Sequence, residues 1–177
     1  MGFERADSAL YLASQLAKGL SRALQRRAAS LGFSPGQFPV LLALWQEDGL
    51  TQRQLLDRLD IEQATLANTL ARMERDGLVA RSPHPADRRA QIVRLTPHGR
   101  ALEATATDAA ACADDEIFSG FRRFERELLL EYMRMAIANA RRMDRAPDDG
   151  RDKGVGRQPA ETAQADKAAA GGSLGAE

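Results

Sequence analysis

The chain has 177 residues, with 25 basic and 25 acidic side chains and a formal net charge of zero. That length is enough for one domain with a buried core, and the neutral balance argues against a protein that coats nucleic acid regardless of its sequence. There is no apolar run of about 18 residues and no leader-like segment, so we expect a cytoplasmic protein that neither spans a membrane nor is exported by that route. Cys112 is the single cysteine, which excludes an internal disulfide.

Residues 8–30 carry apolar side chains at alternating spacings of three and four, from Leu10 through Ala17 to Leu24. This spacing predicts an amphipathic helix. Leu12 and Leu16 widen the stripe, so that the helix can bury two sides. It packs either on its own domain alone or also on a second subunit.

A second helix is expected to start at Ser34-Pro35-Gly36-Gln37, with Ser34 as its cap and Gln37 closing a capping box. Phe38, Leu41, Leu42 and Trp45 follow at helical spacing and predict the central core helix. Gly49 ends this helix and leaves room for a short third strand at Leu50.

Two short helices are predicted next, from Thr51 to Leu59 and from Glu62 to Asp76. Thr51 and Gln54 form a capping box for the first helix. Gln52 and Arg53 lie at its N-terminus, where unpaired N–H groups favour a DNA phosphate. A solvated surface charge is an equally good interpretation of Arg53.

The second of these helices has two contrasting faces. Leu66, Leu70 and Met73 form a narrow apolar arc, which we expect to be buried. The rest of the surface is small, polar or basic and suits base edges and phosphates. The candidate DNA-contacting residues are Gln63, Ala64, Thr65, Asn68, Thr69, Arg72 and Arg75. An isolated helix with this pattern would more simply have a solvated face, and the segment that follows favours DNA.

That segment predicts a hairpin with strands at 78–81 and 91–95 and an arginine-bearing loop from Ser82 to Ala90. Asp87, Arg88 and Arg89 lie near its tip, where arginines suit a narrow minor groove. Asp87 would hold one arginine in an ion pair and leave the other for DNA; a solvated loop is the alternative. Helix, turn, helix and hairpin together are the layout of a winged helix-turn-helix, which places one helix in the major groove.

Thr96-Pro97 begins a long helix, expected to run to residue 118 or 119, with an alanine-rich middle. A break is expected at Ser119-Gly120, and a strongly apolar last helix at about 124–143. That helix is either buried within one subunit or pairs across a two-fold axis. Residues 146–177 are poor in large apolar side chains and predict a disordered tail.

No residue pattern points to catalysis, a cofactor or a metal. His84 and His98 have no further ligand at zinc spacing, and no phosphate-binding or nucleophile motif is present. We therefore expect a protein that is not an enzyme. Cys112, among alanines in the middle of a helix, is expected to be a buried and inert thiol.

The combination of motifs resembles the MarR family of bacterial transcriptional regulators. It comprises T-x-x-Q-L-L-x-x-L from Thr51, then I-x-x-x-T and M-E-x-D-G-L-V-x-R, then D-R-R, then V-x-L-T-x-x-G. The resemblance covers roughly residues 8–143 and is densest from Thr51 to Gly99. It implies a homodimer that binds a palindromic operator in double-stranded DNA, usually as a repressor. It also implies release by a small, often aromatic ligand, or by cysteine oxidation in some branches, whose reactive cysteine lies in the first helix.

Together these arguments predict a mainly α fold with a small β-wing, about six helices and a two- to three-stranded antiparallel sheet. A single domain would cover 1–145, with a DNA-binding lobe at about 34–98 and a dimerisation lobe at about 5–31 and 99–143. The expected dimer contacts are Leu10, Phe118, Phe121, Leu128, Leu129, Tyr132 and Met133. The resemblance places an effector pocket near Leu12, Gln15, Leu16, Phe38, Leu42 and Leu102, for which plain core packing is the alternative.

Three other functions stay open. The protein could be a DNA-binding activator, or a redox-responsive regulator that uses Cys112. It could also be an interaction module that meets protein instead of DNA, although this would call for an acidic or apolar face on the Glu62–Asp76 helix.

Overall fold

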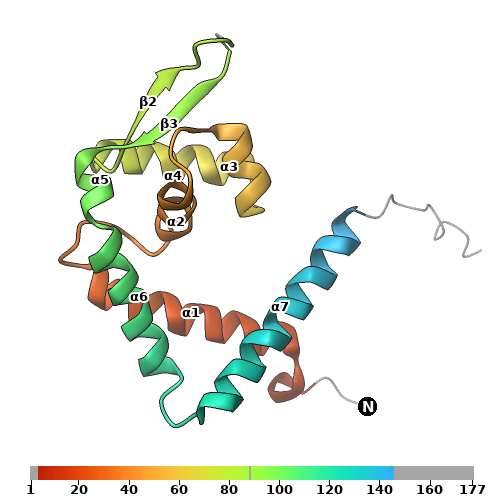
Figure 1. The fold of residues 1–177 in the computed structure, drawn as a ribbon. Coiled ribbons are helices and arrows are strands. Elements are labelled where there is room, and N and C mark those ends of the chain that lie inside the picture. Colours follow the sequence, from red (N-terminus) through yellow and green to blue (C-terminus); the bar gives the residue numbers. More distant parts are fainter. Residues whose placement is uncertain (1–3, 88, 146–177) are drawn as a thin grey trace, which may run out of the picture. The chain divides into compact units, whose positions relative to one another are not determined.

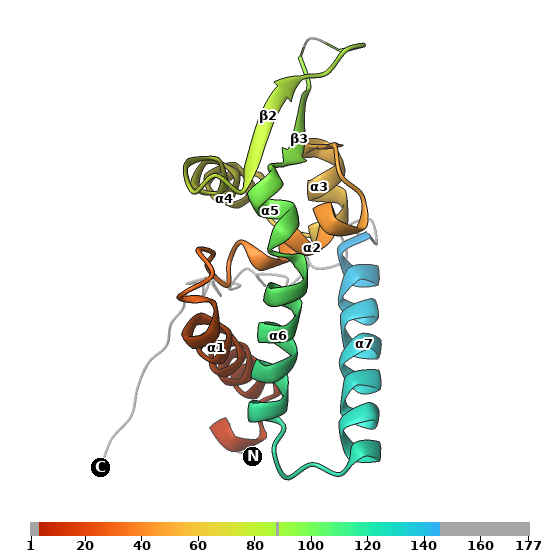
Figure 2. The ribbon, with the colours of Figure 1, turned by 60° about the vertical axis from the view of Figure 1, so that its left-hand side comes forward.

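The computed structural model describes residues 4–87 and 89–145, so the predicted tail at 146–177 lies outside the described residues. The elements in chain order are η1 (Arg5–Asp7), α1 (Ala9–Ala28), α2 (Phe38–Gln46), β1 (Leu50–Thr51), α3 (Gln52–Leu59), α4 (Gln63–Arg75), β2 (Val79–Pro83), β3 (Gln91–Leu95), α5 (Pro97–Ala101), α6 (Glu103–Ile117) and α7 (Arg123–Arg145). This mainly α fold with a small sheet confirms the predicted fold class (Figures 1 and 2). The chain forms two compact units that divide between Arg126 and Glu127, inside α7. We describe each unit by itself.

In the first unit the three strands form one antiparallel sheet in the order β1-β3-β2. Val79 pairs with Leu95 and Ser82 with Ile92, so β2 and β3 make the predicted hairpin. Leu50 pairs with Val93, which confirms the short third strand. The hairpin extends away from the helices beneath it (Figure 2).

One apolar core joins the helices to the inner face of this sheet. Leu41 and Leu44 of α2, Leu55 of α3, Leu66 of α4 and Val93 of β3 are all fully buried in it. The buried positions of α4 are the predicted Leu66, Leu70 and Met73. Because these side chains fix the rotation of α4 about its axis, they also decide which of its residues face outward.

Local signals set the ends of α3 and α4. The Thr51 side chain accepts from the Gln54 N–H while Gln54 accepts from the Thr51 N–H, which is the predicted capping box. At the end of α4, Gly77 has a φ of +70°, and the Leu78 N–H donates to the Met73 carbonyl at 2.8 Å. This left-handed glycine cap turns the chain sharply from α4 into the hairpin.

Thr96 caps α5 as expected, and its side-chain oxygen accepts from the Gly99 N–H at 3.0 Å. Gly99 lies so close to Leu78, the residue before β2, that a Cβ added there would meet the Leu78 carbonyl oxygen at 2.2 Å. The expected long helix is interrupted at Leu102, so α5 and α6 are separate, and α6 ends at Ile117. The break near Ser119-Gly120 and the final helix are present as predicted.

The prediction for the start of the core helix is only partly confirmed: the Gln37 side-chain oxygen accepts from the Ser34 N–H as the capping box requires, but the helix does not begin there. Residues 34–37 form a turn in which the Gln37 N–H donates to the Ser34 carbonyl, and α2 begins only at Phe38. Leu42 is exposed, not buried, because α2 buries the side that carries Val40, Leu41, Ala43 and Leu44. Phe38 and Trp45 are partly buried and pack edge to face.

Away from the sheet, α1 packs against α6 (Figure 1). Glu116 of α6 forms ion pairs with Arg26 and, at 2.6 Å, with Arg27 of α1. Only the C-terminal half of α1 is buried, through Ala23, Leu24 and Ala28. In the described part of the chain, no helix is long and apolar enough to cross a membrane.

Candidate nucleic-acid interface

The outward side of α4 presents a small, polar and basic surface. Gln63, Ala64, Thr65, Asn68, Arg72 and Arg75 are all exposed. Thr69 is only partly exposed, and its hydroxyl donates to the Thr65 carbonyl at 2.9 Å. Six of the seven residues predicted on this helix are thus accessible, whereas Thr69 is only partly so.

Acidic side chains border this surface. Glu74 is exposed on α4, and Arg81 of β2 donates to its carboxylate through Nε at 3.0 Å. The hydrogen bond with Arg81 holds the pKa of Glu74 below its ordinary value. Because Glu74 and Arg81 form an ion pair with each other, neither is a candidate DNA contact.

The loop of the hairpin is organised by side chains that accept backbone N–H groups. The Nδ1 atom of His84 accepts from the Ala86 N–H at 3.2 Å and from the Asp87 N–H at 3.1 Å. The Asp87 carboxylate accepts from the Arg89 N–H at 2.9 Å. The expected ion pair therefore does not form with the Arg89 side chain, since Asp87 bonds the Arg89 backbone instead. Arg88 lies outside the described residues.

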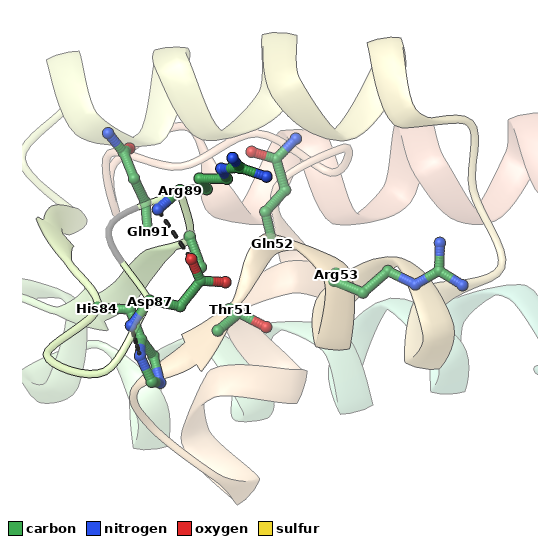
Figure 3. A pocket seen from close by; sticks show the side chains of 8 residues that line it. Thr51, Gln52, Arg53, His84, Asp87, Arg89 and Gln91 are labelled. Atoms are coloured by element: carbon green, nitrogen blue, oxygen red, sulfur yellow. Dashed lines mark hydrogen bonds between the residues drawn. The ribbon is translucent and has the colours of Figure 1, made fainter.

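A hollow of about 600 Å³ lies between this loop and the N-terminus of α3 (Figure 3). The structure brings four of the predicted residues together around this hollow. They are Gln52 and Arg53 of α3, and Asp87 and Arg89 of the hairpin loop at 82–90, which we call the wing loop. Arg53 also pairs with Asp57 at 3.2 Å within α3. With two guanidinium groups, two amides and one carboxylate around it, the hollow offers donors to an anion or to the edge of a base.

Four residues that line this hollow were not predicted as contacts from the sequence: Thr51, His84, Ala90 and Gln91. His84 and Gln91 line it beside Arg89. The position of Gln91 as the first residue of β3 could have indicated its place at the base of the loop. No sequence signal identifies the His84 hydrogen bonds, because they depend on the conformation of the closed loop.

The residues proposed for an effector pocket differ in their environments. Leu102 belongs to the core, and Phe38 packs against Phe33 and Trp45. Leu12 is 51% exposed, and Leu42 is exposed as well. Gln15 is exposed and Leu16 is partly buried. In the isolated chain this set thus does not share one buried environment.

The prediction of a buried Cys112 was wrong, because its residue is exposed on α6. The residues around it, from Ala109 to Ala113, are small, and α6 buries Ala106 and Ala113 against α1. Cys112 lies on a different side of the helix from these two alanines, which the alanine-rich sequence alone does not reveal.

The residues expected at a dimer interface are mostly accessible. Leu10 is 83% exposed in the first unit, where Phe121 is also exposed. Phe118 is the exception, since it is buried and packs edge to face against Phe121. In the second unit Leu128 and Tyr132 are exposed, whereas Leu129 and Met133 are partly buried.

A helix pair followed by a projecting hairpin, with the second helix buried on its apolar side, defines a winged helix-turn-helix DNA-binding protein. The MarR family model matches residues 33–90, which cover the whole of this arrangement up to the end of the wing loop. The transcriptional regulator HosA of Escherichia coli O111:H- is 36% identical over 98 residues, which span 55% of this chain and 73% of HosA. The chain belongs to the MarR family of transcriptional regulators, and its relatives are not enzymes.

Solved structures agree with this assignment over a longer stretch. A MarR regulator from Methanosarcina mazei Go1 has 28% identity and a TM-score of 0.68, over 73% of this chain and 94% of that one. BpsR of Bordetella bronchiseptica, whose DNA binding is regulated by 6-hydroxynicotinic acid, has 25% identity and a TM-score of 0.69. It aligns over 82% of this chain and 99% of BpsR.

Proposed function

We propose that this protein is a homodimeric repressor that binds a palindromic operator through α4 and the wing and leaves it when a small aromatic or lipophilic ligand binds. The main support for the proposal is the orientation of α4. The buried Leu66, Leu70 and Met73 turn the polar and basic side of α4 outward, in the same unit as the arginine-bearing loop. In a helix-turn-helix protein this places α4 in the major groove and the loop beside the neighbouring minor groove.

Each side chain then has a role that its chemistry supports. Asn68 can pair with the N6 and N7 edge of adenine, and Ala64 or Ala71 can meet a thymine methyl group. Arg72 and Arg89 would contact phosphates or enter the minor groove, and Gln52 and Arg53 would contact a phosphate beside α3. Within the described residues, neither Arg72 nor Arg89 forms an ion pair that would compete with DNA.

The exposed apolar side chains support the dimer. Leu10 in the first unit, and Leu128, Tyr132 and Met135 in the second, are large apolar groups left open to water in the single chain. The last three recur at spacings of four and three on α7, so they form one stripe of the helix. An unpaired stripe of this kind favours a second subunit, and a palindromic operator requires two recognition helices related by a two-fold axis.

Response to a ligand is proposed on two grounds. BpsR, a structural relative, is regulated by a hydroxylated aromatic acid. The predicted pocket residues Leu12, Leu16 and Leu42 are apolar and incompletely buried, so they can accept an apolar ligand once other groups cover them. The ligand must bind the DNA-incompetent state more tightly in order to release the operator.

The direct test is a gel shift on the DNA that flanks the protein's own gene, repeated with a panel of phenolic compounds. We expect a specific complex that Arg89→Ala weakens, with a smaller dependence of affinity on salt. Asn68→Ala should instead relax the base preference at one operator position. Binding with the same affinity to operator and unrelated duplexes would contradict the proposal, and no phenolic effect would remove its ligand part.

Exposure of Cys112 favours redox control as a second candidate. Here oxidation of the thiol to a sulfenic acid, and not an aromatic ligand, would release DNA. Peroxide should then abolish the gel shift of the wild type but not that of Cys112→Ser. A peroxide-resistant complex in the wild type would leave the ligand mechanism as the remaining proposal.

A further inference from the structure

Gln37 is the one buried polar residue in the described part of the core, with only 3% of its surface exposed. Both ends of its amide are used. Its oxygen accepts from the Ser34 N–H at 2.7 Å, and its nitrogen donates to the Asp76 carboxylate at 2.8 Å. The side chain therefore joins the turn before α2 to the residue that ends the recognition helix α4.

Asp76 continues this connection toward the candidate DNA surface. Its Oδ2 atom accepts from Gln37, while its Oδ1 atom lies 3.3 Å from Nε of Arg75. The Arg75 side chain is 73% exposed. A carboxylate that holds the Nε edge orients the planar guanidinium and leaves its terminal nitrogens for a phosphate.

We infer that Gln37 is a positioning residue for DNA binding, because it fixes the Asp76 carboxylate that aims Arg75 at the operator backbone. The inference rests on the proposed function. It adds to the DNA-binding machinery a residue that cannot touch DNA itself, because Gln37 is buried. A buried amide with both ends bonded defines the position of its partner more sharply than an apolar side chain of similar volume does. Asp76 without Gln37 could rotate about its side-chain bonds, and Arg75 would rotate with it.

The test compares Gln37→Met, which keeps the volume and removes the hydrogen bonds, with the wild type on a duplex selected from a random-sequence pool. We expect affinity to fall on the order of fivefold, comparable to the net contribution of one ordinary hydrogen bond. The loss should be similar on all sequences and should reduce the salt dependence, because Arg75 is assigned to a phosphate. Thermal melting of each variant shows whether it is folded.

A double-mutant cycle with Arg75→Ala separates positioning from a general loss of stability. If Gln37 acts through Arg75, then Gln37→Met should weaken binding little further once Arg75 is alanine. Gln37→Glu alone places two carboxylates together. The double variant Gln37→Glu with Asp76→Asn restores the hydrogen bond with donor and acceptor exchanged, so it should bind DNA more tightly than Gln37→Glu alone.

The outcomes distinguish the two proposals. An undiminished effect of Gln37→Met in the Arg75→Ala background, or no recovery in the exchange variant, would overturn the role of Gln37 alone. A wild-type protein that selects no sequence from the pool would overturn the proposed function itself, and the positioning role with it.

Discussion

At the scale of single residues, the shape of the wing depends on one imidazole nitrogen. Nδ1 of His84 accepts two backbone N–H groups, from Ala86 and from Asp87. This arrangement holds the chain that leads to Arg89. The backbone that leads to Arg89, the arginine proposed to contact DNA, is therefore held by a neighbour with a different chemical role.

We predict that His84→Ala weakens operator binding severalfold, whereas His84→Asn retains most of it, because the asparagine oxygen can accept the same N–H groups. Fluorescence titration of a labelled duplex measures both effects. Amide hydrogen exchange at Ala86 and Asp87 should be faster in His84→Ala only. Equal binding by the two variants would show that the accepted hydrogen bonds do not matter to the wing.

Trp45 connects the core helix to α5 at the same scale. Its Nε1–H donates to the Gly99 carbonyl at 2.9 Å, and its ring packs edge to face on Phe38. Trp45→Ala should lower the free energy of unfolding by about 3 kcal/mol, at the low end for this substitution because the ring is only partly buried. Trp45→Phe keeps most of the packing and should lose about 1 kcal/mol, the value of the hydrogen bond. Urea unfolding checks both values, and a Trp45→Ala protein as stable as the wild type would contradict the assignment.

At the scale of elements, the pairing of α1 with α6 includes a charge cluster as well as small apolar residues. Glu116 accepts from Arg27 and Arg26, and the hydrogen bond with Arg27 is the largest cause that holds the pKa of Glu116 below its ordinary value. A carboxyl group with a lowered pKa in the folded state stabilises the fold above its unfolded pKa. This contribution is lost as the pH falls through the folded value.

We predict that Glu116→Gln lowers stability at neutral pH by a small amount, since the groups are accessible to water. The difference from the wild type should shrink as the pH falls below about 4.5, the ordinary value for this carboxyl group. Asp108→Asn is a matched control, because Asp108 is exposed on the same helix and forms no ion pair with a described residue. A difference that does not change with pH would show that the Arg27–Glu116 pair does not contribute.

At the scale of the whole molecule, the proposed recognition of a palindromic operator needs two copies of α4 placed about 34–36 Å apart, one turn of DNA. The single chain provides one copy and leaves apolar groups of α1 and α7 exposed. A ligand that changes the separation of the two copies would release DNA without touching α4.

The corresponding prediction concerns α7. Leu128→Glu combined with Tyr132→Glu should convert a dimer to a monomer and lower operator affinity by on the order of a hundredfold or more, because the second half-site no longer adds its binding energy. Glu131→Gln on the same helix is the control and should leave both unchanged. Sedimentation velocity measures the subunit number, and a wild-type monomer that binds a full operator tightly would contradict the two-fold arrangement.

Much of the site could be read from local patterns, since each of them has a local physical cause. The arc of Leu66, Leu70 and Met73 follows from helical periodicity, and the ends of α3 and α4 follow from a capping box and a left-handed glycine. Local patterns gave wrong predictions where the packing of several elements decides which side of a helix is buried. The start of α2, the exposure of Leu42 and the exposure of Cys112 depend on which neighbours cover each side.

The amino-acid order alone determined the order of elements apart from the division between α5 and α6, and it determined the buried side of α4, because periodicity, capping and turn chemistry act over a few neighbouring residues. Only the tertiary structure decided that His84 closes the wing loop and that Gln37 reaches Asp76. The latter pair is separated by 39 positions in the chain. A hydrogen bond over that separation exists only after packing has brought two elements together, so no local pattern can specify it.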